Sequence, residues 1–267
     1  MFVSELKKNL IHKLCKLRNL LIDRDDFTWS RYHKIYEGEM IEGEKHFTFK
    51  LSDNDFLVEG RNLRIKRLPK PLHPNHELLY KIIYDLRPTS IFEVGCGGGD
   101  HLSNLKKIFF KANLKKTKFS GSDLLENQIK KLYERNPELK KFAKIFVHDI
   151  TTSPLPKMEE LIYTQTVIMH LQKRNNHLDA LRNIFQSSKK FVVLMENWER
   201  HNFYEDLRKI SKENDFSWKK IYFYKVDDGK QISMVLSKVK IESNYLNYEE
   251  LRDNKELLKY LKKKGSS

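Results

Sequence analysis

The sequence predicts a doubly wound α/β fold with a mostly parallel sheet and an antiparallel last strand. From Ser90 onward, apolar runs of strand length alternate with amphipathic stretches of helix length, the pattern of βαβ units. The run at 90–94 ends in a glycine-rich turn that opens a helix. Two β-rich runs, 218–226 and 231–239, flank Asp227-Asp228-Gly229-Lys230, a strong hairpin signal, so the final strand should be antiparallel.

The alternation assigns a range to each element of this domain. A helix capped by Asn75 carries Leu78, Leu79, Ile82 and Ile83 at helical spacing ahead of the sheet. The strands are then expected at 90–95, 117–122, 144–148, 160–166 and 190–196, and the helices at 100–112, 124–135, 174–187 and 202–213.

The segment ahead of this domain reads as a helical and hairpin-like appendage. Leucines three and four apart in 3–22 form the apolar face of a helix. We interpret this face as packing on the core or a sister subunit rather than on a membrane, because the polar face carries acids at its end. Residues 46–51 and 56–66 alternate as short strands. The prolines of 69–74 mark a linker, so the expected divisions are 1–74 (appendage), 75–240 (main domain) and 241–267 (basic helical tail).

An aromatic stretch at 27–36 stands out within the appendage. It contains Trp29, Tyr32 and His33. Such side chains can form a lid over an acceptor pocket, or they can pack the appendage onto the main domain. Both interpretations stay open from the sequence.

The amino-acid composition limits the class of protein to which this sequence can belong. The 267 residues carry a net charge of +15, with 12% aromatic residues and a mean hydropathy of −0.65. This composition argues against global disorder, and no apolar run reaches the ~20 residues of a membrane helix. We expect a cytoplasmic protein without a membrane partner. The charge permits nucleic acid or an anionic substrate as partner, but it also fits a solvated surface rich in lysine. Cys15 and Cys96 alone cannot form a disulfide scaffold or a cysteine-rich zinc site, and we expect no metal ion.

The glycine turn carries the first functional signal. Glycines at 95, 97, 98 and 99 let the backbone turn sharply and let a ligand approach bare N–H groups, but Asp100 stands where the dinucleotide fingerprint has its third glycine. Glu93-x-Gly95-x-Gly97-x-Gly99 resembles motif I of the class I S-adenosylmethionine (SAM)-dependent methyltransferases. The resemblance implies a seven-stranded sheet with an antiparallel last strand and SAM as cofactor. It implies contacts to SAM by Glu93, Gly95, Cys96, Gly97 and Gly99.

Acids follow the next two strands. Asp123 ends the second strand, where an acid can accept hydrogen bonds from the ribose hydroxyls of a nucleoside; its alternative role is a helix N-cap. Asp149 follows the third strand and, by the same resemblance, would accept from the adenine amino group; its alternative role is a turn that bonds its own backbone. Leu124 and Ile150, beside these acids, are the apolar residues expected to cover the cofactor.

The fourth strand resembles motif IV of the same family. It leads into Thr164 and Gln165, which would approach the methyl donor, and then into an apolar turn with His170. In this sequence Thr-Gln-Thr replaces the more common small or acidic residues.

Methyl transfer to a hydroxyl or an ammonium needs a base, and histidine is the usual choice near neutral pH. His170 and His201, after the fourth and fifth strands, are the candidate catalytic residues. The alternative for His170 is a bracing role in its helix turn, and for His201 a helix cap. Asn197 and Arg200 lie beside His201 in sequence and, with Trp29, Tyr32 and His33, are the candidate acceptor-binding residues.

The predicted function is therefore methyl transfer from SAM to oxygen, with nitrogen as the alternative, on a small polar metabolite, including anionic, phosphorylated or sugar-like acceptors of surface-glycan or natural-product assembly. A second possibility is an RNA or tRNA methyltransferase, which the positive charge accommodates. A third is a scaffold that keeps the fold and binds SAM without chemistry. The sequence does not specify the oligomeric state.

Overall fold

A computed structural model describes residues 50–66, 68, 72–171, 176–198, 201–227 and 232–251. Predictions on other parts of the chain lie outside these residues: the helix at 3–22, the aromatic stretch with Trp29, Tyr32 and His33, Arg200, and the tail beyond Leu251. Within the described residues, no helix is long and apolar enough to cross a membrane.

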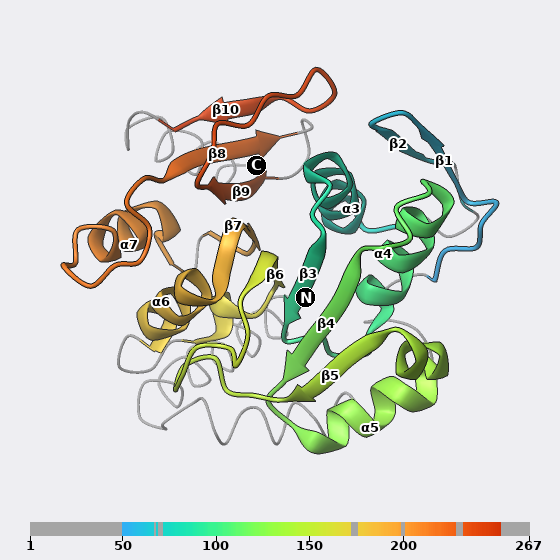
Figure 1. Cartoon of the computed structure of the whole chain (residues 1–267), viewed down its shortest axis with the longest axis horizontal. Helices are drawn as coiled ribbons and strands as arrows, with labels where there is room; N and C mark the ends of the chain where they lie inside the picture. The colour runs from blue at the N-terminus through green and yellow to red at the C-terminus, as the bar shows by residue number, and fades with distance from the viewer. Residues whose placement is uncertain are drawn as a thin grey trace, which may run out of the picture.

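The centre of the structure is an eight-stranded sheet with the order β10-β8-β9-β7-β6-β3-β4-β5 (Figure 1). Strands β5, β4, β3, β6 and β7 are parallel neighbours, and β9 is antiparallel to both β7 and β8. The expected mostly parallel, doubly wound sheet with an antiparallel last strand is confirmed. The strands are β3 (Ser90–Val94), β4 (Lys118–Asp123), β5 (Ala143–Val147), β6 (Glu159–Gln165), β7 (Ser188–Met195), β8 (Tyr222–Asp227), β9 (Ile232–Ser237) and β10 (Tyr248–Glu250).

Helices cover both faces of the sheet. Alternate residues of a strand point to opposite faces, and β7 shows this clearly: Val193 packs in one apolar core with α3 and α4, and Val192 packs in the other with α6 and α7. The helices are α3 (Pro74–Leu86), α4 (Asp100–Lys111), α5 (Glu126–Arg135), α6 (Asn176–Ser187) and α7 (Phe203–Ile210), with 3-10 turns η1 (Pro137–Lys141) and η2 (Ile168–His170).

The described part of the appendage packs on this domain. Strands β1 (Phe56–Glu59) and β2 (Asn62–Ile65) form the hairpin expected within 56–66. Leu51 is buried, and its N–H donates to Asn104 Oδ1 at 2.8 Å. Residues 50–51, placed in a strand by the sequence, are not in one, because this backbone N–H is bonded to a side chain of α4 instead.

The cap of α3 also differs from the prediction. His73, and not Asn75, is the N-cap: its Nδ1 accepts from the Asn75 N–H at 3.2 Å. Pro74 then takes the first helical position, where its missing N–H costs nothing.

The tail prediction is wrong at Tyr248–Glu250. These residues form β10, antiparallel to β8 with Tyr248 opposite Val226, where the sequence suggested a helix. Without β10, β8 would present an unpaired edge of N–H and C=O groups. The Tyr248 ring packs edge-on against Tyr224, with centroids 6.0 Å apart. The pairing and this burial outweigh the local helical pattern of lysine and glutamate.

Candidate active site

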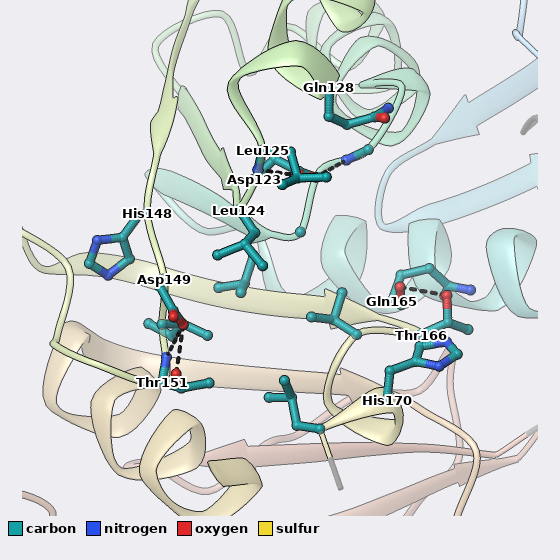
Figure 2. A pocket seen from close by; sticks show the side chains of 16 residues that line it. Asp123, Leu124, Leu125, Gln128, His148, Asp149, Thr151, Gln165, Thr166 and His170 are labelled. Atoms are coloured by element: carbon teal, nitrogen blue, oxygen red, sulfur yellow. Dashed lines mark hydrogen bonds between the residues drawn. The ribbon is translucent and has the colours of Figure 1, made fainter. Parts of the chain in front are cut away.

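A cavity of about 220 Å³ opens at the carboxyl ends of β3, β4, β5 and β6 (Figure 2). In open α/β sheets ligands bind at this edge. The lining residues are Val94, Gly95, Gly97, Asp123, Leu124, Leu125, Gln128, His148, Asp149, Ile150, Thr151, Gln165, Thr166, Val167, His170 and Leu171.

Three glycines of the turn, Gly95, Gly97 and Gly99, have positive φ, and each serves a different purpose. A Cβ on Gly95 would lie 2.5 Å from Val167 Cγ2, so this glycine lets the segment after β6 approach. A Cβ on Gly99 would lie 2.6 Å from Leu139 Cδ1 and 2.8 Å from Leu132 Cγ, so Gly99 serves helix packing and does not line the cavity. A Cβ on Gly97 would meet nothing within 4 Å. Gly97 therefore leaves space open at the cavity.

A structural role explains why Asp100 stands where the dinucleotide fingerprint has a glycine. Its buried carboxylate accepts from Arg135 Nε and Nη2 at 2.9–3.0 Å and from Asn136 Nδ2 at 2.8 Å. Asn136 Nδ2 also donates to the Gly98 carbonyl at 2.7 Å. The start of α4 and the end of α5 thus hold the glycine turn between them. A bidentate arginine pair of this kind could not be assigned from the sequence alone.

Asp123 lies in the cavity wall, as expected from its place after β4. Its Oδ2 accepts from the Gly97 N–H at 3.0 Å and its Oδ1 from the Leu125 N–H at 3.2 Å. It is not the N-cap of α5, which is Leu125. Leu124 is 39% exposed and lines the cavity beside it. An acid and an apolar surface therefore meet at this edge.

Asp149 and Ile150 line the cavity after β5. Figure 2 shows Asp149 on the side away from Gln165 and His170. Asp149 Oδ1 accepts from the Thr151 N–H at 2.9 Å and from Thr151 Oγ1 at 2.7 Å. This is the turn that the sequence left as the alternative role for Asp149. The turn also holds the carboxylate in the wall of the cavity.

The segment after β6 supplies the third side. Gln165, Thr166 and His170 lie together in Figure 2 and line the cavity. Thr166 has φ +53°, which is unusual for a β-branched residue and is typical of functional sites. Its N–H donates to the Met195 carbonyl at 3.0 Å, and this bond holds the backbone in place.

Glu196, directly after β7, anchors the same segment. Its buried carboxylate accepts from the Val167 N–H at 3.1 Å and the Met169 N–H at 3.0 Å. Burial raises the pKa of Glu196, and the side chain of Thr164 and these backbone N–H groups lower it. The sequence analysis missed this role, although an acid at the end of a parallel strand is a signal that could have suggested it.

Besides Gly99, three other expected cofactor residues do not line the cavity. Glu93 is a buried residue of β3. Burial raises the pKa of its carboxyl well above the usual range, and the hydrogen bond with Tyr163 lowers it. Burial likewise raises the pKa of the Cys96 thiol, which favours the inert thiol form. Thr164 is fully buried within β6. These side chains are turned into the packed layers of the sheet.

The candidate residues after β7 also lie outside the cavity wall. Asn197 is exposed and does not line the cavity, and neither does His201. The His201 ring stacks on His177, with centroids 4.1 Å apart and planes at 13°. Burial, followed by the neighbouring His177, lowers the pKa of His201. Of the two candidate bases, His170 alone reaches the cavity.

Comparisons with known proteins find similar solved structures at low sequence identity. Neither a family model nor a curated protein matches this chain. A SAM-bound amino pentose methyltransferase from Micromonospora echinaspora, involved in calicheamicin biosynthesis, is 18% identical with a TM-score of 0.39, over 49% of this chain and 52% of that chain. A TehB-like SAM-dependent methyltransferase from Corynebacterium glutamicum is 16% identical with a TM-score of 0.45, over 64% of this chain and 90% of that chain.

A third similar structure is the magnesium protoporphyrin IX methyltransferase from Synechocystis PCC 6803 with bound SAM. It is 14% identical with a TM-score of 0.44, over 60% of this chain and 76% of that chain. The match spans about half the length of the first of these proteins. At such values the class of this protein depends on its own strand order and cavity: it is a doubly wound α/β protein with a cavity at the carboxyl ends of four parallel strands.

Proposed function

We propose that this protein is a SAM-dependent methyltransferase that acts on oxygen, with nitrogen as the alternative, of a small polar acceptor. The observation that carries the proposal is the joint position of Gly97, Asp123, Asp149 and Gln165 in one cavity wall. Each lies at, or just after, the carboxyl end of a different strand of the sheet, at the places where the motif resemblance implies a cofactor contact.

The residues of the cavity fit SAM. Gly97 leaves room for a ligand against the bare backbone, and two carboxylates give the cavity an acidic character that suits a cationic sulfonium. Asp123 would bind the ribose hydroxyls and Asp149 the adenine amino group, with Leu124 and Ile150 against the ring. When bound, SAM supplies an electrophilic methyl group.

The chain itself has to hold the acceptor, exclude water and remove a proton. We assign to a ring nitrogen of His170 the role of taking the proton from the acceptor, because His170 lines the cavity beside Gln165 and Thr166. His201 lies outside the cavity wall and is not assigned as base. Glu196 acts as a positioning residue, since it holds the backbone that carries His170.

We further propose that the appendage 1–74 covers the acceptor side of the main domain 75–240. Trp29, Tyr32, His33 and Arg200 would then bind the acceptor, and aromatic and basic side chains suit a polar or anionic molecule. These assignments rest on the sequence alone.

A pair of glycine variants tests the cofactor site. Gly97 and Gly60 both have positive φ, and a Cβ on either meets nothing within 4 Å. Gly97→Ala and Gly60→Ala should therefore lose similar stability, about 1 kcal/mol each. Titration calorimetry with SAM should show binding to wild type and Gly60→Ala, and a loss of at least about tenfold for Gly97→Ala, equivalent to 1.4 kcal/mol. Absence of SAM binding to the folded wild type would sink the proposal.

Measurement of turnover distinguishes a methyltransferase from a scaffold that binds SAM without chemistry. Release of S-adenosylhomocysteine, measured against pools of small polar metabolites and against RNA, should depend on a small-molecule pool and fall strongly in His170→Asn, whose SAM affinity should stay near wild type. Filter binding to RNA at two salt concentrations tests the other enzyme class, because an RNA methyltransferase should bind with a steep salt dependence.

A further inference from the structure

A second cluster of polar side chains lies next to η2, outside the cavity wall. It consists of His177 in the first turn of α6, His201 after β7, and Asp206 in the first turn of α7. One ligand atom from each of the three lies within 4.8 Å of the others. The start of α6, the segment after β7 and the start of α7 therefore bring two imidazoles and a carboxylate to one place.

The two rings have nitrogens without hydrogen-bond partners among the described residues. Nε2 of His201 and Nδ1 of His177 are both buried and unpartnered, and His177 as a whole is only 8% exposed. A buried polar atom without a partner costs roughly 1–3 kcal/mol. Within the described residues, Nε2 of His201 thus has no protein partner, and the cluster is open to a ligand there.

The surroundings of the rings resemble those of metal-binding histidines. His201 is hydrogen-bonded to the backbone of the η2 turn, at Ile168 and Leu171. Metal-bound histidines commonly donate their second ring N–H to a carbonyl or a carboxylate in this way. His177 Nε2 lies 3.4 Å from Asp206 Oδ2.

We propose that His177, His201 and Asp206 bind a divalent transition-metal ion of the zinc type, with a fourth position left to water. Two imidazoles and one carboxylate form a donor set that suits zinc better than magnesium or calcium. Bond lengths near ~2.0–2.1 Å require ligand atoms about 3.3 Å apart, so binding would draw the cluster together and tilt the stacked rings. The sequence analysis expected no metal, because it considered the two cysteines and not these histidines.

The position of the site suggests what the metal would do. His201 contacts the backbone of η2, and Leu171 at the end of η2 lines the cavity. An ion held there would tie α6, α7 and the segment after β7 to the segment that carries His170. This is a structural staple beside the cavity, and it does not depend on the proposed methyl transfer.

The first experiment uses the full chain and Zn²⁺ alone. Titration calorimetry should give one site per chain, and Co²⁺ should give the intense visible absorption of a tetrahedral complex. His201→Asn and Asp206→Asn should each weaken binding at least about tenfold, the lower bound seen even for residues that only support ligands. His148→Asn and Glu205→Gln are matched controls: His148 is hydrogen-bonded to the Ser153 carbonyl outside the cluster, and Glu205 neighbours Asp206 in α7. Both should bind as wild type does.

A second measurement avoids reliance on variants that fail to fold. In the wild-type protein with ¹⁵N-labelled imidazoles, one equivalent of Zn²⁺ should shift the ring signals of two of the ten histidines. Signals spread over other histidines, or equal binding by His201→Asn, would show an ordinary surface site and overturn the proposal. Absence of binding to folded wild type would overturn it as well.

Discussion

At the scale of single residues, Glu196 links the sheet to the segment after β6, which carries His170. It is buried, and its carboxylate accepts from two backbone N–H groups around the start of η2, while the backbone before them holds Thr166 at positive φ. The geometry of His170 and Gln165 therefore depends on an acid that directly follows the neighbouring strand β7.

Truncation of this residue tests that dependence. Glu196→Ala should lower the free energy of unfolding by about 3 kcal/mol, because two buried N–H groups lose their acceptor. Urea unfolding checks the change. Glu196→Gln keeps one acceptor oxygen and should lose less. Glu126→Ala removes an exposed carboxylate and should change stability by no more than about 0.5 kcal/mol. A loss of equal size in both alanine variants would contradict the anchoring role.

At the scale of elements, the glycine turn sets how closely α4 can lie to α5 and η1. Gly99 has φ +77° and is the N-cap of α4. The Cβ that it lacks would collide with Leu132 of α5 and Leu139 of η1. The turn is thus built for packing as well as for a ligand.

Gly99→Ala should destabilise the protein by about 2–4 kcal/mol, since about 1–2 kcal/mol comes from a left-handed backbone and the rest from the collision. Gly60→Ala carries the backbone cost without the collision and should lose about 1 kcal/mol. Thermal and urea unfolding of the pair compare the two costs. An equal loss of unfolding free energy in both variants would show that the close packing at Gly99 does not contribute to stability.

At the scale of the whole molecule, one buried carboxylate joins three distant parts of the chain. Asp85, at 1% exposure in α3, accepts from the Tyr248 hydroxyl of β10 at 3.0 Å. Arg61, from the hairpin of β1 and β2, places Nε 3.4 Å from its Oδ1 and donates through Nη2 to its backbone carbonyl. The hairpin, α3 and the last strand are therefore coupled.

Tyr248→Phe should cost about 1–2 kcal/mol, because the buried Asp85 carboxylate loses a hydrogen bond while the aromatic packing stays. Tyr222→Phe, on the neighbouring strand β8, keeps its stacking on Tyr224 and should change stability by less than about 0.5 kcal/mol. A double-mutant cycle of Tyr248→Phe with Asp85→Asn measures the coupling directly. A coupling near zero would show that β10 is held by its backbone pairing alone.

Much of the fold and half of the site could be predicted from local patterns. The strand with its glycine turn, and the acids at 123 and 149, follow from short-range rules, because a parallel strand is a buried apolar run and its carboxyl end carries polar residues. The helix cap at His73 and the strand at 248–250 could not be predicted, because local propensity is a weak prior that tertiary contacts override.

By itself the sequence determined the order of strands and helices, the glycine turn and the identity of the residues that meet at one edge of the sheet. The tertiary structure decided which of these side chains reach the cavity. In the fold, Glu93, Cys96 and Thr164 are buried in the packed layers of the sheet, whereas His170 lies at the cavity wall. It also brought His201 to His177 and Asp206. The physical reason is that periodicity assigns a residue to a face of its own element, whereas its neighbours across the fold depend on how the elements pack.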